Sequence, residues 1–125
     1  PYYAAWVDDA PAVCARVKAA VLARDLEALG VAAEASALRM HAAAMSAAPA
    51  VIYWNGATVE ALAEVRRLRA RGVPVYATID AGPHVKALTL PEHEAAVARA
   101  LEAVPGVLRT IATLPGQGAR VIDRG

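Results

Sequence analysis

Apolar positions recur at helical spacing in four stretches of the chain. Val13, Val17 and Ala20, for example, lie three or four positions apart, which places them on one face of a helix. Each stretch is bounded by a residue type that starts or stops helices. The predicted helices run from Pro11 to Arg24, from a cap at Asp25 to a stop at Ala47, from a cap at Thr58 to a stop at Gly72, and from a capping box of Thr89 and Glu92 to about Val104.

Short runs of alternating and β-branched residues predict strands between and after these helices. Residues 73–79 and 85–90 flank a tight turn and therefore predict an antiparallel hairpin. Residues 107–111 and 120–122 are expected to add two strands, whereas residues 50–54 form either a strand or a buried extended segment. The order of the elements predicts an α+β fold, in which a small, mainly antiparallel sheet is covered by about four helices.

Composition narrows the class of protein. A length of 125 residues suits a single domain over 1–125. Hydrophobic residues make up 58% of the chain, but no stretch approaches the roughly 18 uninterrupted apolar residues that predict a membrane span. The net charge of +1 argues against a nucleic-acid partner, and the single cysteine is compatible with a reducing compartment, so we expect a cytoplasmic protein. The first residues contain neither a leader nor a methionine, which predicts a fragment of a longer gene product.

Most candidate polar residues have an ordinary structural explanation. His41 is expected to be a hydrogen-bonded structural histidine rather than a ligand, because no carboxylate or second ligand lies at a neighbouring helical position. Cys14 is expected to be a packed thiol. The arginines of residues 66–71 could meet phosphate, but Glu60 and Glu64 on the same helix favour a solvated, ion-paired face. No residue pattern predicts a metal site.

The turn at residues 80–83, Asp-Ala-Gly-Pro, is the most informative local feature. An apolar strand delivers Asp80 to a turn in which Gly82 permits a positive φ and close approach of the backbone to a ligand. Two interpretations are open: Asp80 either hydrogen-bonds the amides of its own turn or acts on a ligand. His84 directly follows the turn, and it could face the same cleft.

The sequence around this turn resembles a family signature. Residues 78–85, Thr-Ile-Asp-Ala-Gly-Pro-His-Val, are similar to the T-M-D-A-G-P-N-V motif of diphosphomevalonate decarboxylases, which belong to the GHMP kinase superfamily. Residues 37–42, Ala-Leu-Arg-Met-His-Ala, resemble the A-L-x-M-H-A helix of that family. Further similarity is found in Tyr3, in Trp6-Val7-Asp8, in residues 49–54 and in residues 65–72. The resemblance therefore spans nearly the whole chain.

This resemblance implies a GHMP-kinase-type C-terminal domain of ferredoxin-like, α+β architecture, which packs beside an N-terminal ATP-binding domain that is absent from this sequence. It implies that Asp80 is catalytic and orients or deprotonates the tertiary 3-hydroxyl of the substrate. Ala81, Gly82 and His84 are then expected to bind that substrate, mevalonate 5-diphosphate. The implied cofactors are ATP and magnesium, both bound mainly by the N-terminal domain, and the implied assembly is a homodimer.

Two positions depart from the family pattern. His84 and Ser36 both stand where the family often has asparagine. These departures leave open a phosphomevalonate decarboxylase or a mevalonate-type kinase domain. A free-standing α+β regulatory or dimerisation module is a third alternative, because the chain has 125 residues and contains no visible nucleotide loop.

Overall fold

The chain forms helices and a hairpin in the order that the sequence predicts for its first hundred residues. The computed structural model describes residues 2–122. Its elements are α1 (Tyr3–Ala23), α2 (Leu26–Met45), α3 (Gly56–Ala70), β1 (Val75–Ile79), β2 (Val85–Thr89), the short 3-10 helix η1 (Pro91–His93) and α4 (Glu94–Glu102). Four α-helices and one antiparallel sheet confirm the predicted α+β class, although the sheet has two strands among the described residues.

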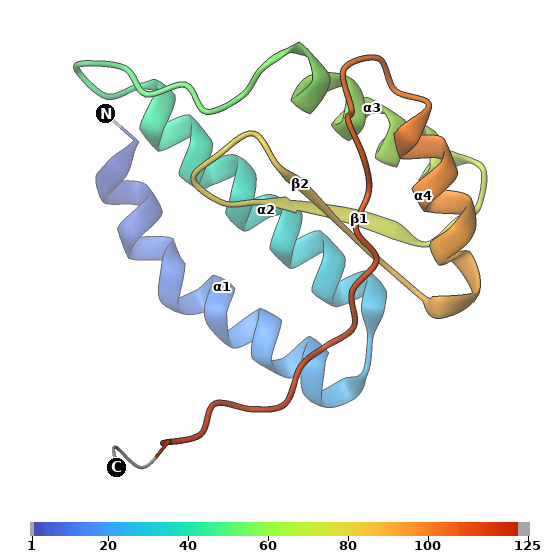
Figure 1. The fold of residues 1–125 in the computed structure, drawn as a ribbon. Helices are drawn as coiled ribbons and strands as arrows, with labels where there is room; N and C mark the ends of the chain where they lie inside the picture. The colour runs from blue at the N-terminus through green and yellow to red at the C-terminus, as the bar shows by residue number, and fades with distance from the viewer. Residues whose placement is uncertain (1, 123–125) are drawn as a thin grey trace.

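The hairpin lies between two groups of helices. β1 and β2 pair antiparallel, with Val75 opposite Thr89 and Ile79 opposite Val85. Figure 1 shows α1 and α2 running side by side on one side of this hairpin, with α3 and α4 on the other. The turn that joins the strands therefore lies at the opposite end of the sheet from Val75, where β1 begins.

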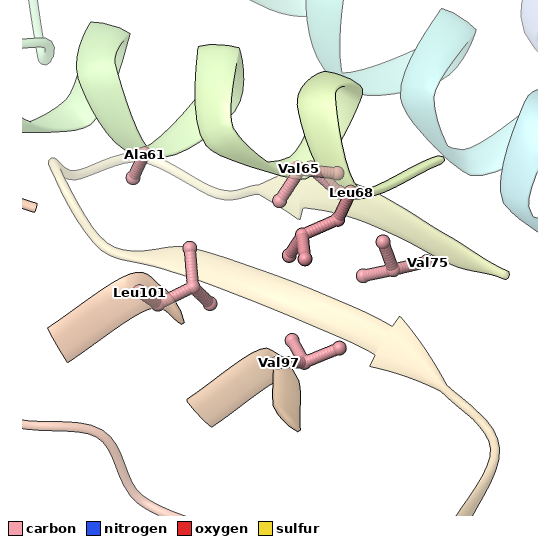
Figure 2. Packing of buried hydrophobic residues seen from close by; sticks show 7 residues of the cluster. Ala61, Val65, Leu68, Val75, Val97 and Leu101 are labelled. Atoms are coloured by element: carbon pink, nitrogen blue, oxygen red, sulfur yellow. The ribbon is translucent and has the colours of Figure 1, made fainter. Parts of the chain in front are cut away.

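The main core fills the space between α3, the hairpin and α4. Because side chains alternate along a strand, Val75 and Ala77 of β1 point to the same face. Figure 2 shows Val65 and Leu68 of α3 directed toward that face. The buried cluster consists of Ala61, Val65, Leu68, Val75, Ala77, Val97 and Leu101. This packing fixes the hairpin relative to α3, which matters for the turn described below.

The outer edge of β1 is closed by two charged side chains. Glu34 of α2 accepts a hydrogen bond from the backbone N–H of Ala77 at 2.9 Å, and Arg69 of α3 donates to the carbonyl of Val75 at 3.1 Å. The same two side chains form a bidentate ion pair, with N–O distances of 2.9 and 3.1 Å. Exposed strand edges otherwise present unpaired backbone groups. The pair therefore satisfies two backbone groups on the side of β1 that β2 does not cover.

A glycine allows α2 to approach the other face of β1. Gly30 is buried, and a Cβ atom at this position would lie 2.0 Å from the ring of Tyr76. Burial raises the pKa of the Tyr76 hydroxyl. The Arg69 guanidinium lies 4.7 Å from the centre of the same ring, a distance at which cation–π attraction is significant.

Three of the predicted helix starts differ from those observed. The cap at Asp25 is confirmed, since its side chain accepts a hydrogen bond from the backbone of Ala28. The start at Pro11 is wrong: α1 begins at Tyr3 and continues through Pro11. Pro11 is exposed there, so the carbonyl that it leaves without a donor can be hydrated. The cap of α3 is Asn55 rather than Thr58, which is instead the partner residue of the capping box.

The predicted capping box before the fourth helix is also wrong. The hydroxyl of Thr89 donates to the carbonyl of Pro74 at 2.8 Å, which closes the end of the hairpin instead of capping a helix. The chain then makes the single turn η1 at Pro91 before α4 begins at Glu94. Proline suits this first turn because it has no N–H to satisfy.

The two strands predicted near the C-terminus do not form. Residues 107–111 and 120–122 have no regular secondary structure, and side chains such as Leu108 and Val121 are exposed. A strand requires a neighbour that offers paired backbone groups, and none of the described residues pairs with this segment. Residues 50–54 likewise have no regular secondary structure, and only Tyr53 and Trp54 among them are partly buried. No helix within residues 2–122 combines the length and the apolar character needed to cross a bilayer.

Candidate functional site

The turn between β1 and β2 presents Asp80 to solvent. Ile79, the last residue of β1, is buried, whereas the Asp80 side chain is 79% exposed. The backbone N–H of Gly82 donates to the Asp80 carbonyl at 2.8 Å, so this turn is closed by its own backbone. The carboxylate accepts no hydrogen bond from the amides of the turn among the bonds described, which disfavours a purely turn-forming role.

Gly82 has less conformational significance than expected. Its φ does not lie in the left-handed region, unlike that of Gly72 or Gly106, and a Cβ atom there would meet nothing within 4 Å. The positive φ that glycine permits is therefore not adopted at this position. The open space above Gly82 remains compatible with close approach of another molecule.

Lys86 is the ionic partner of Asp80, and this residue was not predicted from the sequence. Its Nζ atom lies 2.6 Å from Asp80 Oδ2, and its side chain is 52% exposed. Lys86 stands on β2 opposite Thr78, so it reaches the turn along the same face of the hairpin. The position of a lysine one residue inside the second strand was a usable signal. Exposed ion pairs of this kind are weak, which leaves the carboxylate free to exchange partners.

The turn is attached to the first turn of α3. The hydroxyl of Thr58 donates to the carbonyl of Pro83 at 2.9 Å. Thr58 is itself buried, at 2% exposure, and its backbone N–H donates to the Asn55 side chain at 2.9 Å. Neither Thr58 nor Asn55 was identified as a site residue from the sequence, because the contact joins segments that are 25 positions apart.

The other predicted site residues lie on the same turn. Ala81 and His84 are exposed, and Gly82 is partly exposed. The bonds and ion pairs of residues 2–122 include none between His84 and Asp80, so the structure brings these two side chains to one turn without joining them.

His41 lies in a buried environment, unlike the residues of the exposed turn. The side chain is fully buried, and neither ring nitrogen has a hydrogen-bond partner among the described residues. Its ring packs against those of Tyr53 and Trp54, at centroid distances of 5.8 and 4.8 Å. The structural role is as predicted, but the expected hydrogen bond is wrong. The contacts hold the segment before Asn55 against α2.

The charged face of α3 is largely ion-paired, as predicted. Glu64 accepts from Arg67 at 2.7 Å and from Arg71 at 2.9 Å. The hydrogen bond from Arg67 lowers the pKa of Glu64 below its usual value. Arg69 is an exception, since it points to Glu34 across the domain, and that hydrogen bond raises the Arg69 pKa.

Two further expectations concern metal and thiol chemistry. Within residues 2–122, no three His, Cys, Asp or Glu side chains lie close enough together to hold a metal ion. Cys14 is exposed, so the prediction of a packed thiol is wrong.

The fold and the turn define a small α+β domain whose polar signature lies on the turn of a hairpin. The family described as the mevalonate 5-diphosphate decarboxylase C-terminal domain matches residues 7–118. The chain therefore belongs to this family. A search of curated protein sequences gave no match.

Solved structures agree with this assignment. The mevalonate diphosphate decarboxylase from Enterococcus faecalis is 36% identical, with a TM-score of 0.77 over 82% of this chain and 32% of that one. The enzyme from Staphylococcus aureus is 32% identical, with a TM-score of 0.78 over 82% and 31% of the two chains. A structure of MDDEF in complex with MVAPP, AMPPCP and magnesium gives 36% identity and a TM-score of 0.79 over 85% and 33%. The chain spans about a third of the length of these proteins.

Proposed function

We propose that this chain is the C-terminal part of an ATP-dependent carboxy-lyase that converts mevalonate 5-diphosphate to isopentenyl diphosphate, with release of ADP, phosphate and carbon dioxide. Membership of the family supports this reaction. The observation that carries the proposal is the exposed Asp80 carboxylate on a turn anchored to α3. The chain alone is expected to be inactive, because the nucleotide must be held by a partner domain.

Asp80 would act on the tertiary 3-hydroxyl of the substrate. A carboxylate within hydrogen-bond reach of an alcohol can orient it and accept its proton as the oxygen attacks the γ-phosphate of ATP. Attack releases ADP and leaves a phosphate ester at C3. Departure of that phosphate takes the C–O electron pair, and the electron pair of the carboxyl C–C bond then forms the alkene as carbon dioxide leaves.

Lys86 would pair with the carboxylate until the substrate arrives, without fixing its position. Its ammonium lies 2.6 Å from Asp80 Oδ2, one of the two carboxylate oxygens that could receive the proton. Since both side chains are exposed, the substrate hydroxyl can replace the lysine without a large cost in free energy. Ala81 and Gly82 would line the approach, where the absence of bulky side chains leaves room.

ATP and magnesium would be held mainly by an N-terminal domain of the same enzyme. When bound, magnesium neutralises the triphosphate during phosphoryl transfer. The MDDEF complex contains AMPPCP and magnesium, which supports the use of ATP and magnesium by the proposed enzyme.

The test is turnover of the full-length enzyme that contains this chain. Asp80→Asn is expected to reduce carbon dioxide release by ~100-fold or more, because it removes the base while it preserves the shape of the side chain. Glu92→Gln is a matched control: Glu92 is an exposed acid just before α4, on another surface of the domain. Near-normal turnover of the Asp80→Asn variant would remove Asp80 from the mechanism.

His84 motivates one comparison of substrates. The enzyme should release carbon dioxide from mevalonate 5-diphosphate faster than from mevalonate 5-phosphate. A reversed preference would favour a phosphomevalonate decarboxylase, and ADP formation without carbon dioxide would favour a kinase. The His84→Asn variant carries the residue that is more usual in the family. It should keep the same preference for the diphosphate.

The cellular setting and the assembly complete the proposal. We expect a cytoplasmic enzyme that forms a homodimer, with one active site per chain. The single cysteine, which allows no disulfide within the chain, supports a reducing compartment. Light scattering on the full-length enzyme would test the dimer directly, and a monomer with full activity would contradict it.

A further inference from the structure

The Asp80 side chain needs an external constraint if it is to meet one particular hydroxyl. Its carboxylate is 79% exposed, and its ionic partner Lys86 is carried on a long, exposed side chain. Neither burial nor this ion pair therefore fixes the carboxylate in space. Its position depends on the backbone of the turn.

Outside the strand ladder, the turn has two described backbone contacts. One is internal, from the Gly82 N–H to the Asp80 carbonyl at 2.8 Å. The other leaves the turn, from the Thr58 hydroxyl to the Pro83 carbonyl at 2.9 Å. The second contact is the one that relates the turn to α3, and through α3 to the core of Val65 and Leu68.

The single proton of the Thr58 hydroxyl can serve only one acceptor at a time. The Asn55 side-chain oxygen lies 3.1 Å away, but it already accepts from the Thr58 backbone N–H at 2.9 Å. The Pro83 carbonyl is closer, at 2.9 Å. The Thr58 oxygen also accepts from the Asn55 backbone N–H at 3.3 Å, which directs its proton away from Asn55. The proton is thus assigned to Pro83.

The two residues that form this bond differ in burial. Loss of the bond should therefore change the position of the turn more than the stability of the fold. Thr58 is 2% exposed, so water cannot replace its hydroxyl from the helix side. Pro83 is exposed, so its carbonyl can be hydrated if the hydroxyl is removed. Removal of the hydroxyl also takes away the acceptor of the Asn55 backbone N–H, but Asn55 is exposed, so water can replace it. Loss of the hydroxyl should therefore release the turn without leaving an unsatisfied buried group.

We infer that Thr58 is a positioning residue for the proposed reaction: its buried hydroxyl holds the Pro83 carbonyl and thereby sets where Asp80 meets the substrate hydroxyl. This inference rests on the proposed function of Asp80. Small displacements of a reacting group reduce rates strongly, because the bound geometry must approach that of attack.

Thr58→Val tests the inference in the full-length enzyme. Valine has the shape of threonine but no hydroxyl, and it retains the backbone N–H that caps at Asn55. We expect kcat to fall by ~10-fold or more with little change in the KM for ATP. Thr58→Ser, which keeps the hydroxyl, should restore most of the turnover.

Thr89→Val is the matched control. Thr89 makes the same kind of bond, from its hydroxyl to the carbonyl of Pro74 at 2.8 Å, but at the opposite end of the hairpin. Its removal should leave kcat unchanged. Equal losses of kcat in Thr58→Val and Thr89→Val would reduce both residues to structural roles and overturn the inference.

Two further measurements separate this inference from the proposed function. Hydrogen exchange at the Gly82 amide should accelerate in Thr58→Val whatever reaction the enzyme performs, and unchanged exchange would contradict the inference. Thr58→Val added to Asp80→Asn should cause no additional loss of kcat, because Thr58 acts through Asp80. Near-normal turnover of Asp80→Asn alone would defeat the proposed function. A defective Asp80→Asn together with a fully active, folded Thr58→Val would defeat only the positioning role.

Discussion

The two ends of the β1–β2 hairpin hold their carboxylates in different ways. At the end where β1 begins, Glu34 is 21% exposed and accepts three hydrogen bonds, two from Arg69 and one from the Ala77 backbone. At the turn, Asp80 is 79% exposed and has one described partner, Lys86. The Glu34 carboxylate is mostly buried and is bonded to the rest of the fold, whereas the position of the Asp80 carboxylate depends on the backbone of its turn.

This difference separates a structural charge from a chemically available one. A substitution of Glu34 would leave Arg69 and the Ala77 backbone N–H without their partner. The fold therefore depends strongly on this residue. Asp80 can change partner or lose its charge at little cost to folding. We therefore expect substitutions at the enclosed end to change stability and substitutions at the turn to change turnover.

The largest stability effect is expected at Gly30, which lies against Tyr76 near the enclosed end. Gly30→Ala places a methyl group 2.0 Å from the Tyr76 ring and should destabilise the domain by about 2–3 kcal/mol. The sign is informative, because alanine in a helix is otherwise about 1 kcal/mol more favourable than glycine. Hydrogen exchange of the β1 amides in the full-length protein measures the loss.

The matched background for this substitution is Tyr76→Ala. Once the ring is absent, Gly30→Ala should become neutral or stabilising by up to about 1 kcal/mol. A Gly30→Ala variant that is destabilised equally in both backgrounds would show that the contact with the ring is not the cause.

A smaller effect is expected at Glu34 itself. Glu34→Gln removes the charge and turns an amide donor toward the Arg69 guanidinium, so it should destabilise the domain by about 1–2 kcal/mol while the folded enzyme keeps its kcat. Glu60→Gln is the control, because Glu60 is 59% exposed and its ion pair with Arg67 spans 3.8 Å. Equal destabilisation by the two substitutions would contradict the structural role assigned to the enclosed carboxylate.

The smallest effect is expected at Glu64 and depends on pH. The hydrogen bond from Arg67 lowers its folded-state pKa below the usual 4.5, so the stabilisation is complete above that value and is lost as the pH falls through the folded pKa. Wild type should therefore exceed Glu64→Gln in melting temperature at about pH 7, and the difference should shrink as the pH falls below 4.5. A difference that grows in acid would reverse the sign of this linkage.

The sequence predicted the elements that depend on local pattern and missed those that depend on distant partners. The hairpin, the Asp25 cap and the placement of Asp80 on a turn follow from alternation, capping chemistry and the Asp-Ala-Gly-Pro sequence. The predicted strands at 107–111 and 120–122 have suitable residues but no ladder partner, and partners are not encoded locally. Thr58 illustrates the same limit, because its pattern predicts a cap while its hydroxyl contacts Pro83.

The proposed role of Asp80 is tested most directly by a rapid-quench single turnover of the full-length Asp80→Asn enzyme with ATP and mevalonate 5-diphosphate. We predict that ADP forms ~100-fold more slowly than in wild type, while the melting temperature stays the same. Formation of ADP at the wild-type rate would show that the exposed carboxylate takes no part in phosphoryl transfer.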